Sequence, residues 1–451
     1  MPSAAHSSER PRPRLKAPSA ARSHPSSRHH AWSQWRSWNC FLDLIDHDII
    51  LGQAKALSSG PLLKAGYGRV GIDGGWVCQN NPSRASACKC GGVGGSYHDK
   101  DGHPVVGLGR FPNLTALTAQ THALGVKLDF YGNSCNCASE EQAVWKSQGG
   151  NPEKDVLALS TYGMDGIKVD GCSPAHNISR WVAALEALDG PPLLLENCGD
   201  NHDKWSPPDL SAVSGTGSCG FQMYRISRDI APQFYSTMYN LQGMRTYANT
   251  SRPGCWPYPD MLQVGSAKLS DDEARSHFAA WCITSSPLIL GFDMSSAAAS
   301  ARATPIVSNS RAIAVNQAWH GHAGGVVSAS EQTFLAATES GAAGGNGGNQ
   351  SLPLWQVYYK PLGPGKAALL LLNISPDPRD ISVSLEHLPI WISTEGERQA
   401  GRQAQAKPRR GGSVALSDVW TGKAVSHSGG STFTAKAVAG HASVFLIAET
   451  N

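Results

Sequence analysis

Two short segments each bring an acidic residue and a cation together in a way that suits catalysis. In the first, Lys168 and Asp170 stand two residues apart at the end of an apolar run. If that run is a strand, side chains alternate between its faces, so these two point the same way. The second segment, residues 221–230, again brings a cation, Arg225, and then an acid, Asp229. Two carboxylates that face one sugar ring are the minimum equipment for glycoside hydrolysis.

Each of these residues also has a plainer interpretation. Asp170 could cap a strand end or form an ion pair there, and Asp229 could pair with its neighbour Arg228 in a loop. Arg225 could form a structural salt bridge to an acid of the barrel. The catalytic interpretation depends on whether the fold brings the two segments together.

The repeating pattern of the chain predicts a fold that does so. From residue 35 onward, short apolar runs alternate with longer mixed stretches, which is typical of β/α repetition. The predicted strands are residues 35–39, 69–73, 126–131, 166–170, 192–197, 222–229, 261–265 and 286–291, and predicted helices include residues 114–124, 178–188 and 271–281. Eight strands with intervening helices predict an α/β fold, a (β/α)8 TIM barrel over residues 31–320. Its active site lies at the carboxyl ends of the strands.

A second pattern begins after about residue 320, where alternating residues predict a C-terminal antiparallel β-sandwich over residues 321–451. The predicted strands are residues 333–338, 354–359, 367–374, 381–388 and 431–448. Two insertions, residues 341–350 and 394–412, are predicted to be flexible. The second is basic, and such a run is more often a solvated loop than a binding site. Residues 1–30 read as a disordered or targeting extension.

Composition argues against several classes of partner. The net charge is only +3, and residues 1–30 hold six Arg or Lys against one Glu, so nucleic acid is an unsupported partner. No apolar run approaches 18 residues, so we expect no membrane span. The histidines show no ligand spacing, and we expect no metal. A sandwich after the barrel is compatible with a homodimer.

The cysteines point to an oxidising compartment. All eleven lie between Cys40 and Cys282, and the C-x-C pairs that start at Cys88 and Cys135 lack zinc-ribbon spacing, so disulfides are favoured over metal. Five Asn-X-Ser/Thr sequons, at residues 113, 177, 249, 349 and 373, agree with secretory passage. We expect an extracellular, lysosomal or vacuolar protein, although the N-terminus shows no recognisable signal peptide.

Seven ordered motifs resemble glycoside hydrolase family 27, the α-galactosidase or melibiase family. They are residues 35–41 (WRSWNCF), 70–76 (VGIDGGW), 125–131 (GVKLDFY), 165–172 (DGIKVDGC), 225–230 (RISRDI), 257–262 (PYPDML) and 277–290 (HFAAWCITSSPLIL). One such motif would be weak evidence, but seven in the family's order are not. The C-terminal region resembles the family loosely, chiefly at residues 418–422. The resemblance implies an exo-α-galactosidase that needs no cofactor and releases terminal galactose from oligosaccharides or glycoconjugates.

The resemblance also implies a role for each matching residue. Asp170 corresponds to the nucleophile that forms a covalent glycosyl-enzyme, and Asp229 to the general acid and base of a retaining mechanism. Lys168 should help to keep Asp170 ionised, whereas Asp229 must begin protonated. Their carboxyl groups should lie about 5 to 5.5 Å apart. The implied substrate-binding residues are Trp38, with Trp35 beside it, Asp73, Tyr131, Lys168, Arg225 and Met261.

Three disulfides are implied in the same way. They join Cys137 to Cys172, Cys198 to Cys219, and Cys40 to Cys78. Because eleven is an odd number, at least one thiol stays free within a single chain. Cys282, inside an apolar run, is the candidate.

One departure from the family pattern concerns the sugar. Most members carry two adjacent acids on the second strand, whereas Asp73 is followed here by Gly74. Losing one charged hydrogen bond to a hydroxyl weakens recognition by about 1.5 to 3 kcal/mol. A β-L-arabinopyranosidase would not need the second acid, because its sugar lacks the hydroxymethyl group. Residues 196–201 also depart from the pattern, so an α-N-acetylgalactosaminidase stays open.

Two alternatives come from other classes of protein. A galactose-binding protein without turnover would also explain Gly74, but the presence of both Asp170 and Asp229 argues against it. A metal-dependent barrel hydrolase would need a ligand cluster such as His-x-His on a strand, which the sequence lacks. Chelator sensitivity would distinguish that alternative.

Overall fold

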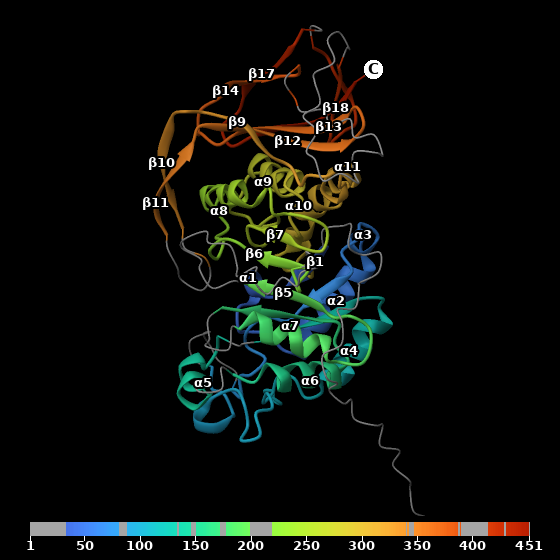
Figure 1. Cartoon of the computed structure of the whole chain (residues 1–451), viewed down its shortest axis with the longest axis vertical. Coiled ribbons are helices and arrows are strands. Elements are labelled where there is room, and N and C mark those ends of the chain that lie inside the picture. Colours follow the sequence, from blue (N-terminus) through green and yellow to red (C-terminus); the bar gives the residue numbers. More distant parts are fainter. Residues whose placement is uncertain are drawn as a thin grey trace, which may run out of the picture.

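The chain folds into a barrel and a β domain that lie one above the other (Figure 1). The computed structural model describes residues 33–80, 88–132, 135–145, 150–171, 177–198, 219–339, 341, 347–386, 388, 414–427 and 430–450. The predicted extension at residues 1–30 and the predicted insertion at residues 394–412 lie outside these ranges.

Eight parallel strands form the first domain, as predicted. They are β1 (Ser33–Arg36), β2 (Arg69–Gly71), β3 (Lys127–Gly132), β4 (Gly166–Asp170), β5 (Leu194–Cys198), β6 (Met223–Arg225), β7 (Trp256–Tyr258) and β8 (Leu288–Leu290). From β1 to β7 each strand pairs with the next in the chain, and β8 pairs with β1. A parallel bridge between Leu262 and Leu290 joins the two ends of the sheet. The sheet therefore closes in the manner of a TIM barrel, and the carboxyl ends of its strands share one face.

Helices surround this sheet, and their starts follow from the sequence. They are α1 (Trp38–Phe41), α2 (His47–Ser59), α3 (Pro61–Lys64), η3 (Val93–Gly95), α4 (Leu114–Ala123), α5 (Ala138–Trp145), α6 (Pro152–Tyr162), α7 (Ile178–Glu186), α8 (Phe234–Tyr247), α9 (Asp271–Ile283), α10 (Ala297–Val307) and α11 (Ser310–Gln317). Ser270 and Glu273 form a capping box at the start of α9. Such reciprocal bonds satisfy two orphan N–H groups and fix where the helix begins.

The predicted seventh strand is wrong in position. The structure places β7 at Trp256–Tyr258, whereas residues 261–265 form a buried loop after it. The chain turns at Asp260, whose φ of 83° is a left-handed conformation that a strand cannot contain. Burial of Leu262 and Val264 explains the apolar run that suggested a strand there.

The second domain is an antiparallel β domain, as predicted. A six-stranded sheet has the order β16 (Ala424–Val425), β15 (Val414–Asp418), β18 (Ser443–Thr450), β13 (Lys366–Asn373), β12 (Trp355–Gly363) and β9 (Gly325–Ala329). A pair of strands, β14 (Arg379–Ser384) and β17 (Thr432–Val438), forms a second sheet. The apolar faces of the two sheets enclose a core of their own that includes Leu369, Leu371 and Phe433. This is the packing of a sandwich.

A further hairpin stands apart from both sheets. It consists of β10 (Thr333–Thr338) and β11 (Gly348–Pro353), which pair with each other and with no other strand that the structure describes. The insertion predicted at residues 341–350 is therefore wrong in its last three residues, which belong to β11. Asn349 and Gln350 pair with Ala337 and Ala336, and this backbone ladder does not need apolar side chains.

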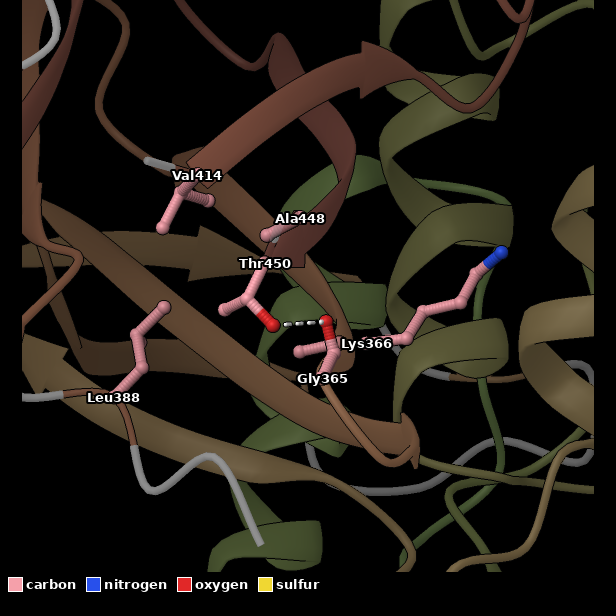
Figure 2. A pocket seen from close by; sticks show the side chains of 7 residues that line it. Gly365, Lys366, Leu388, Val414, Ala448 and Thr450 are labelled. Carbon is pink, nitrogen blue, oxygen red and sulfur yellow. Dashed lines mark hydrogen bonds between the residues drawn. The ribbon is translucent and has the colours of Figure 1, made fainter. Parts of the chain in front are cut away.

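A small pocket opens at the edge of the sandwich (Figure 2). Leu388, Val414 and Ala448 line it with apolar atoms, and Thr450 Oγ1 donates to the carbonyl of Gly365 at 3.3 Å. The side chain of Lys366 extends away from it (Figure 2). Among the described residues that line the pocket, none directs a charged group into it.

Two further expectations concern membrane-spanning helices and the five sequons. Among the described residues, no helix combines the length and the hydropathy needed to cross a bilayer. Of the five sequons, the one at Asn373 is buried, and its side-chain amide donates to three backbone carbonyls. That sequon is inaccessible in the folded chain, whereas Asn113, Asn177, Asn249 and Asn349 are exposed.

Candidate active site

The carboxyl ends of neighbouring strands bring four of the predicted site residues together. Asp170 is the last residue of β4, and Lys168 precedes it on the same face. Tyr131 pairs with Lys168 across β3 and β4. Asp73 lies two residues beyond β2. The parallel register therefore places these side chains at one end of the barrel.

Asp170 is held by hydrogen bonds to both of its carboxylate oxygens. The Tyr131 hydroxyl donates to Oδ2 at 2.9 Å, and the backbone N–H of Gly171 donates to Oδ1 at 2.8 Å. Lys168 Nζ lies 3.9 Å from Oδ2. The side chain of Asp170 is 13% exposed, against 6% for Lys168. Asp170 is therefore fixed in orientation while one edge stays accessible.

Lys168 makes its shortest contact with a different acid from the one expected. Its Nζ donates to Asp73 Oδ2 at 2.8 Å, which is shorter than its 3.9 Å approach to Asp170. Burial alone would lower the pKa of Lys168, but the negative charges of Asp73 and Asp170 raise it overall. The lysine is therefore an ammonium that lies between two carboxylates and stabilises the charge of both.

Asp73 is fixed by its own backbone neighbours as well. Its N–H donates to Ser37 Oγ at 3.0 Å, and the N–H of Gly74 donates to Asp73 Oδ1 at 3.0 Å. Below it, Arg36 pairs with Glu196 at 2.5 Å in a fully buried contact. The positive charges of Arg36 and Lys168 lower the pKa of Glu196 against the effect of burial. A buried charge network inside the barrel thus supports the Asp73 and Asp170 side of the site.

The second acid lies in a different setting. Arg225, the last residue of β6, donates from Nη1 to Asp229 Oδ1 at 2.6 Å, and the same Nη1 lies 3.6 Å from Asp260 Oδ2. Asp229 is 27% exposed, whereas Asp260 is 6% exposed. Burial raises the pKa of Asp260 to about 6, although the charge of Arg225 acts in the opposite direction. The Arg225 guanidinium therefore lies between two carboxyl groups, of which Asp229 is the more exposed.

The plainer interpretation of Asp229 named the wrong cation. Arg225 rather than its sequence neighbour Arg228 makes the 2.6 Å ion pair with Asp229. Arg228 Nη2 donates instead to Thr338 Oγ1 at 2.9 Å, and its guanidinium stacks 4.1 Å above the Tyr239 ring. Arg225 is thus ion-paired with Asp229, and its contact with sugar hydroxyls stays a prediction.

Comparison with known proteins places this arrangement in a family. Residues 30–318 match the model described as alpha galactosidase A, and residues 354–448 match the alpha galactosidase C-terminal beta sandwich domain. The chain belongs to glycoside hydrolase family 27. The resemblance inferred from the seven motifs is thus confirmed, and so is the order of barrel and sandwich.

Individual relatives agree with this assignment to family 27. An α-galactosidase of Oryza sativa subsp. japonica is 30% identical over 290 residues, which span 63% of this chain and 62% of the relative. The match therefore spans less than two thirds of that relative's length. The crystal structure of α-galactosidase I from Mortierella vinacea has a TM-score of 0.68 at 20% identity and covers 94% of this chain and 98% of that one.

A family 27 β-L-arabinopyranosidase from Geobacillus stearothermophilus has the same fold. Its TM-score is 0.66 at 16% identity, with 93% of this chain and 96% of that chain covered. At such identity the likeness concerns the fold alone. It does not decide between the two sugars.

Two tryptophans of this family 27 chain, Trp35 and Trp38, differ in burial. Trp35 is fully buried, and its Nε1 donates to the carbonyl of Phe292 at 2.7 Å, so the expectation that it stacks on a sugar is wrong. Trp38 is partly buried and packs with Met261 in a small apolar cluster. Trp38 and Met261 therefore stay predicted substrate contacts, with Met261 only 4% exposed.

Gly74 lies against a carboxylate that the sequence analysis missed. A Cβ built on Gly74 would lie 2.7 Å from Asp43 Oδ1 and 3.1 Å from the Trp38 ring. Asp43 is 3% exposed, and its Oδ1 has no hydrogen-bond partner within the described residues. Burial raises the pKa of Asp43 to about 6. A second acid is therefore present beside Asp73, but it comes from the segment after α1.

Asp260 is another residue that the sequence analysis passed over. Its carboxylate accepts the N–H of Met261 at 2.6 Å and the N–H of Ile230, next to Asp229, at 2.9 Å. It lies within the motif at residues 257–262, of which only Met261 was predicted to bind substrate. An acid that follows Pro-Tyr-Pro at a strand end was the available signal.

The predicted disulfide pairs are wrong. The structure joins Cys78 to Cys88, Cys90 to Cys137, and Cys219 to Cys255, and Cys135 is also disulfide-bonded. Cys40, Cys198 and Cys282 are free. Cys172 lies outside the described residues, and its predicted partner Cys137 is already bonded to Cys90. Only the prediction that Cys282 is a buried free thiol agrees with the structure.

Local folding explains the observed pairs. An antiparallel bridge between Cys78 and Cys90 folds the chain back, so Cys88 lies 5.0 Å from Cys78 between Cα atoms. Cys198, by contrast, is buried at the end of β5 in register with Asp170. Cys40 lies on α1 with its Sγ directed toward the carbonyl of Ser37. Neither of these two thiols faces the partner predicted for it.

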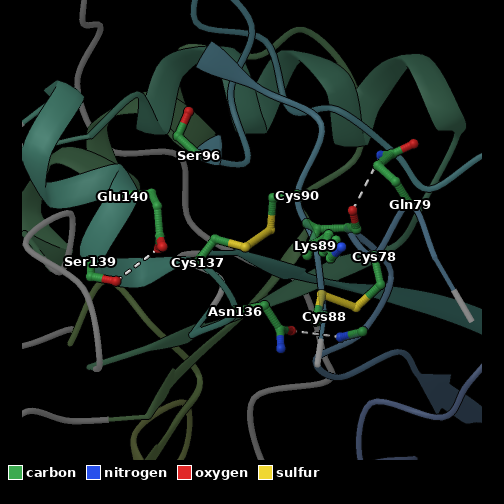
Figure 3. Close-up of a disulfide and its surroundings, with 12 residues drawn as sticks. Cys78, Gln79, Cys88, Lys89, Cys90, Ser96, Asn136, Cys137, Ser139 and Glu140 are labelled. Carbon is green, nitrogen blue, oxygen red and sulfur yellow. Dashed lines mark hydrogen bonds between the residues drawn. A yellow bond between two sulfur atoms is a disulfide. The ribbon is translucent and has the colours of Figure 1, made fainter. Parts of the chain in front are cut away.

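Three sulfurs near the second strand lie close together. The Sγ atoms of Cys88, Cys90 and Cys137 are all within 4.8 Å of one another (Figure 3). Each is bonded to another sulfur in the Cys78–Cys88 or Cys90–Cys137 disulfide. The three sulfurs are therefore disulfide-bonded and are not free thiolates. Asn136, which precedes Cys137, accepts the N–H of Gly75 at 2.8 Å.

Proposed function

We propose that this protein is a retaining exo-α-galactosidase that releases terminal α-D-galactosyl residues from oligosaccharides or glycoconjugates. The observation that carries the proposal is the setting of Asp170. Tyr131, Gly171 and Lys168 all support its charged form, while its side chain keeps an exposed edge. A nucleophilic carboxylate needs both properties.

The proposed reaction proceeds by double displacement. Asp170 attacks the anomeric carbon while the bond to the leaving oxygen breaks, and Asp229 transfers its proton to that oxygen. Asp229 then removes a proton from a water molecule, whose oxygen attacks the anomeric carbon and releases Asp170. Asp73 and Arg225 lie where they could bind sugar hydroxyls. No cofactor enters the proposed steps.

A second candidate is a β-L-arabinopyranosidase, and Gly74 is the observation that favours it. The backbone of Gly74 offers no side chain to a hydroxymethyl group, and the adjacent Asp43 Oδ1 is buried. A sugar without that group loses nothing at such a position. The α-N-acetylgalactosaminidase alternative depends on residues 199–201, which lie outside the described ranges.

Initial rates on an aryl α-D-galactopyranoside test the proposal. The wild type should turn over this substrate, and Asp170→Asn should lower kcat by roughly 10⁴-fold or more. The exposed Asp101→Asn is the matched control and should leave the rate unchanged. Turnover only of the β-L-arabinopyranoside or the α-N-acetylgalactosaminide would replace the proposed substrate. Galactose binding without any turnover would instead favour a lectin.

Passage through the secretory pathway is a related proposal. Its support is the Cys78–Cys88, Cys90–Cys137 and Cys219–Cys255 disulfides, which persist in oxidising compartments. The expected homodimer stays a prediction, and sedimentation of the full chain would test it.

A further inference from the structure

The β10–β11 hairpin lies outside both parts of the chain that match the family. The two family models cover residues 30–318 and 354–448, so residues 319–353 belong to neither. The hairpin forms its own two-stranded sheet and lies beside α8 on the flank of the barrel (Figure 1). It is therefore a feature of this chain that the family assignment does not explain.

The hairpin binds the barrel on both sides of Asp229. Before the acid, Arg228 Nη2 donates to Thr338 Oγ1 at 2.9 Å. After it, Gln233 Nε2 donates to the carbonyl of Ala337 at 2.8 Å, and the N–H of Glu339 donates to Gln233 Oε1 at 3.1 Å. Thr338 is only 6% exposed, so its hydroxyl is part of a buried contact.

Gly341 touches the acid itself. A Cβ built on this glycine would lie 2.4 Å from Asp229 Cβ and 2.7 Å from its carbonyl carbon and oxygen. Gly341 is buried. The atoms that would clash belong to the backbone and to the first side-chain atom of Asp229, so a rotamer change cannot relieve them. Only glycine allows the second domain to approach so closely.

We propose that the β10–β11 hairpin positions the acid/base carboxylate, with Gly341 and Thr338 as its positioning residues. This inference rests on the proposed function, because it takes Asp229 as the proton donor. The hairpin fixes the backbone of Asp229, and Arg225 then orients the carboxyl group. The second domain thereby contributes to proton transfer, whereas Tyr131 and Gly171 of the barrel donate hydrogen bonds to Asp170.

Leaving groups of different basicity test this assignment. An alkyl α-galactoside needs a proton on its leaving oxygen as the glycosidic bond breaks, whereas a 4-nitrophenyl α-galactoside needs it far less. We expect Gly341→Ala to lower kcat/KM for the alkyl substrate roughly 10- to 100-fold and that for the aryl substrate by less than about threefold. The parameter kcat/KM is used because it reports the first, bond-breaking step.

Two variants keep the test decisive. Gly430→Ala adds the same methyl group in the second domain, where no described atom lies within 4 Å of it, and should change neither value. Thr338→Val keeps the volume but removes the acceptor of Arg228, and should show the same selective loss if Gly341→Ala fails to fold. Thermal unfolding checks the fold of each.

Each outcome has one meaning. Equal losses on both substrates, or no loss on either, would overturn the positioning role while leaving an active wild type and its proposed function intact. Absence of turnover by the wild type on both α-galactosides would overturn the proposed function, and this inference with it. A loss confined to the alkyl substrate is the result that supports both.

Discussion

The two carboxylates proposed to act on one sugar are held by differently built halves of the site. Asp170 is bound by Tyr131, Gly171 and Lys168, which all come from β3 and β4 or the residue that follows. Asp229 lies beyond the end of β6, twice as exposed, with Gly341 of the β10–β11 hairpin against it. One half is internal to the barrel, and the other is shared between elements far apart in sequence.

This difference corresponds to the tasks of the two acids. A nucleophile must stay charged and keep one orientation, and a buried ammonium with two neutral donors provides both. An acid/base residue must lose and regain a proton, so it needs partial exposure. Arg225 lies between Asp229 and Asp260, so two carboxyl groups share its charge.

Among the variants that compare the two halves, Lys168→Met should cause the largest effect, because it breaks the internal half. The variant leaves Asp73 and Asp170 as two close carboxylates without their shared cation. We expect kcat/KM to fall roughly 10²- to 10³-fold, which is the usual size of one lost electrostatic stabiliser. The loss should be equal for alkyl and aryl α-galactosides, since the nucleophile serves both.

A surface lysine provides the control for this variant. Lys366→Met removes a partly exposed charge that pairs with Glu449 at 2.5 Å, and it should change the rate by less than about twofold. A loss in Lys168→Met that is confined to alkyl substrates would contradict the separation of the two halves. Thermal unfolding of both variants distinguishes a damaged site from a damaged fold.

The internal half is also the half that the sequence predicted well. Apolar runs that end in an acid revealed β2 and β4, and strand alternation alone placed Lys168 and Asp170 on one face. Closure of a parallel barrel then requires their ends to meet. Short-range periodicity and one topological rule were therefore sufficient to bring Lys168 and Asp170 to this end of the barrel, whereas Asp73 was implied by the family resemblance.

The shared half could not be predicted in the same way. The Gly341 contact with Asp229 spans more than a hundred residues and depends on how two domains pack. Asp260 stands at a left-handed turn, which no apolar period reveals. The three disulfide pairs were implied by the family resemblance, and the cysteines of this chain pair differently. These features follow from tertiary packing, which a single sequence expresses only weakly.

Asp260→Asn should cause an intermediate effect by breaking the shared half. The variant keeps the shape of the side chain but removes the second negative charge near Arg225. Arg225 then pairs with Asp229 alone, which works against proton transfer from that acid to the leaving oxygen. We expect about a tenfold loss of kcat/KM for an alkyl α-galactoside and a smaller one for an aryl substrate. Equal losses on both would show that Asp260 supports the fold of the site rather than proton transfer.

Asp43→Asn should cause the smallest effect. It tests whether Asp43, a second acid in the internal half, binds the sugar. Burial raises the folded-state pKa of Asp43 to about 6, above the usual value, so the folded protein holds this proton more tightly than the unfolded chain. The free energy of unfolding should therefore fall as the pH rises from about 4 through 6. At pH 7 the variant should be more stable by about 1 to 2 kcal/mol, because it removes a buried carboxylate whose Oδ1 has no partner within the described residues. Urea unfolding at pH 4 and pH 7 measures the difference.

If Asp43 also accepts a sugar hydroxyl beside Asp73, KM for the α-galactoside should rise about threefold to tenfold while kcat holds. A more stable variant with an unchanged KM would instead show that Asp43 does not contribute to substrate binding.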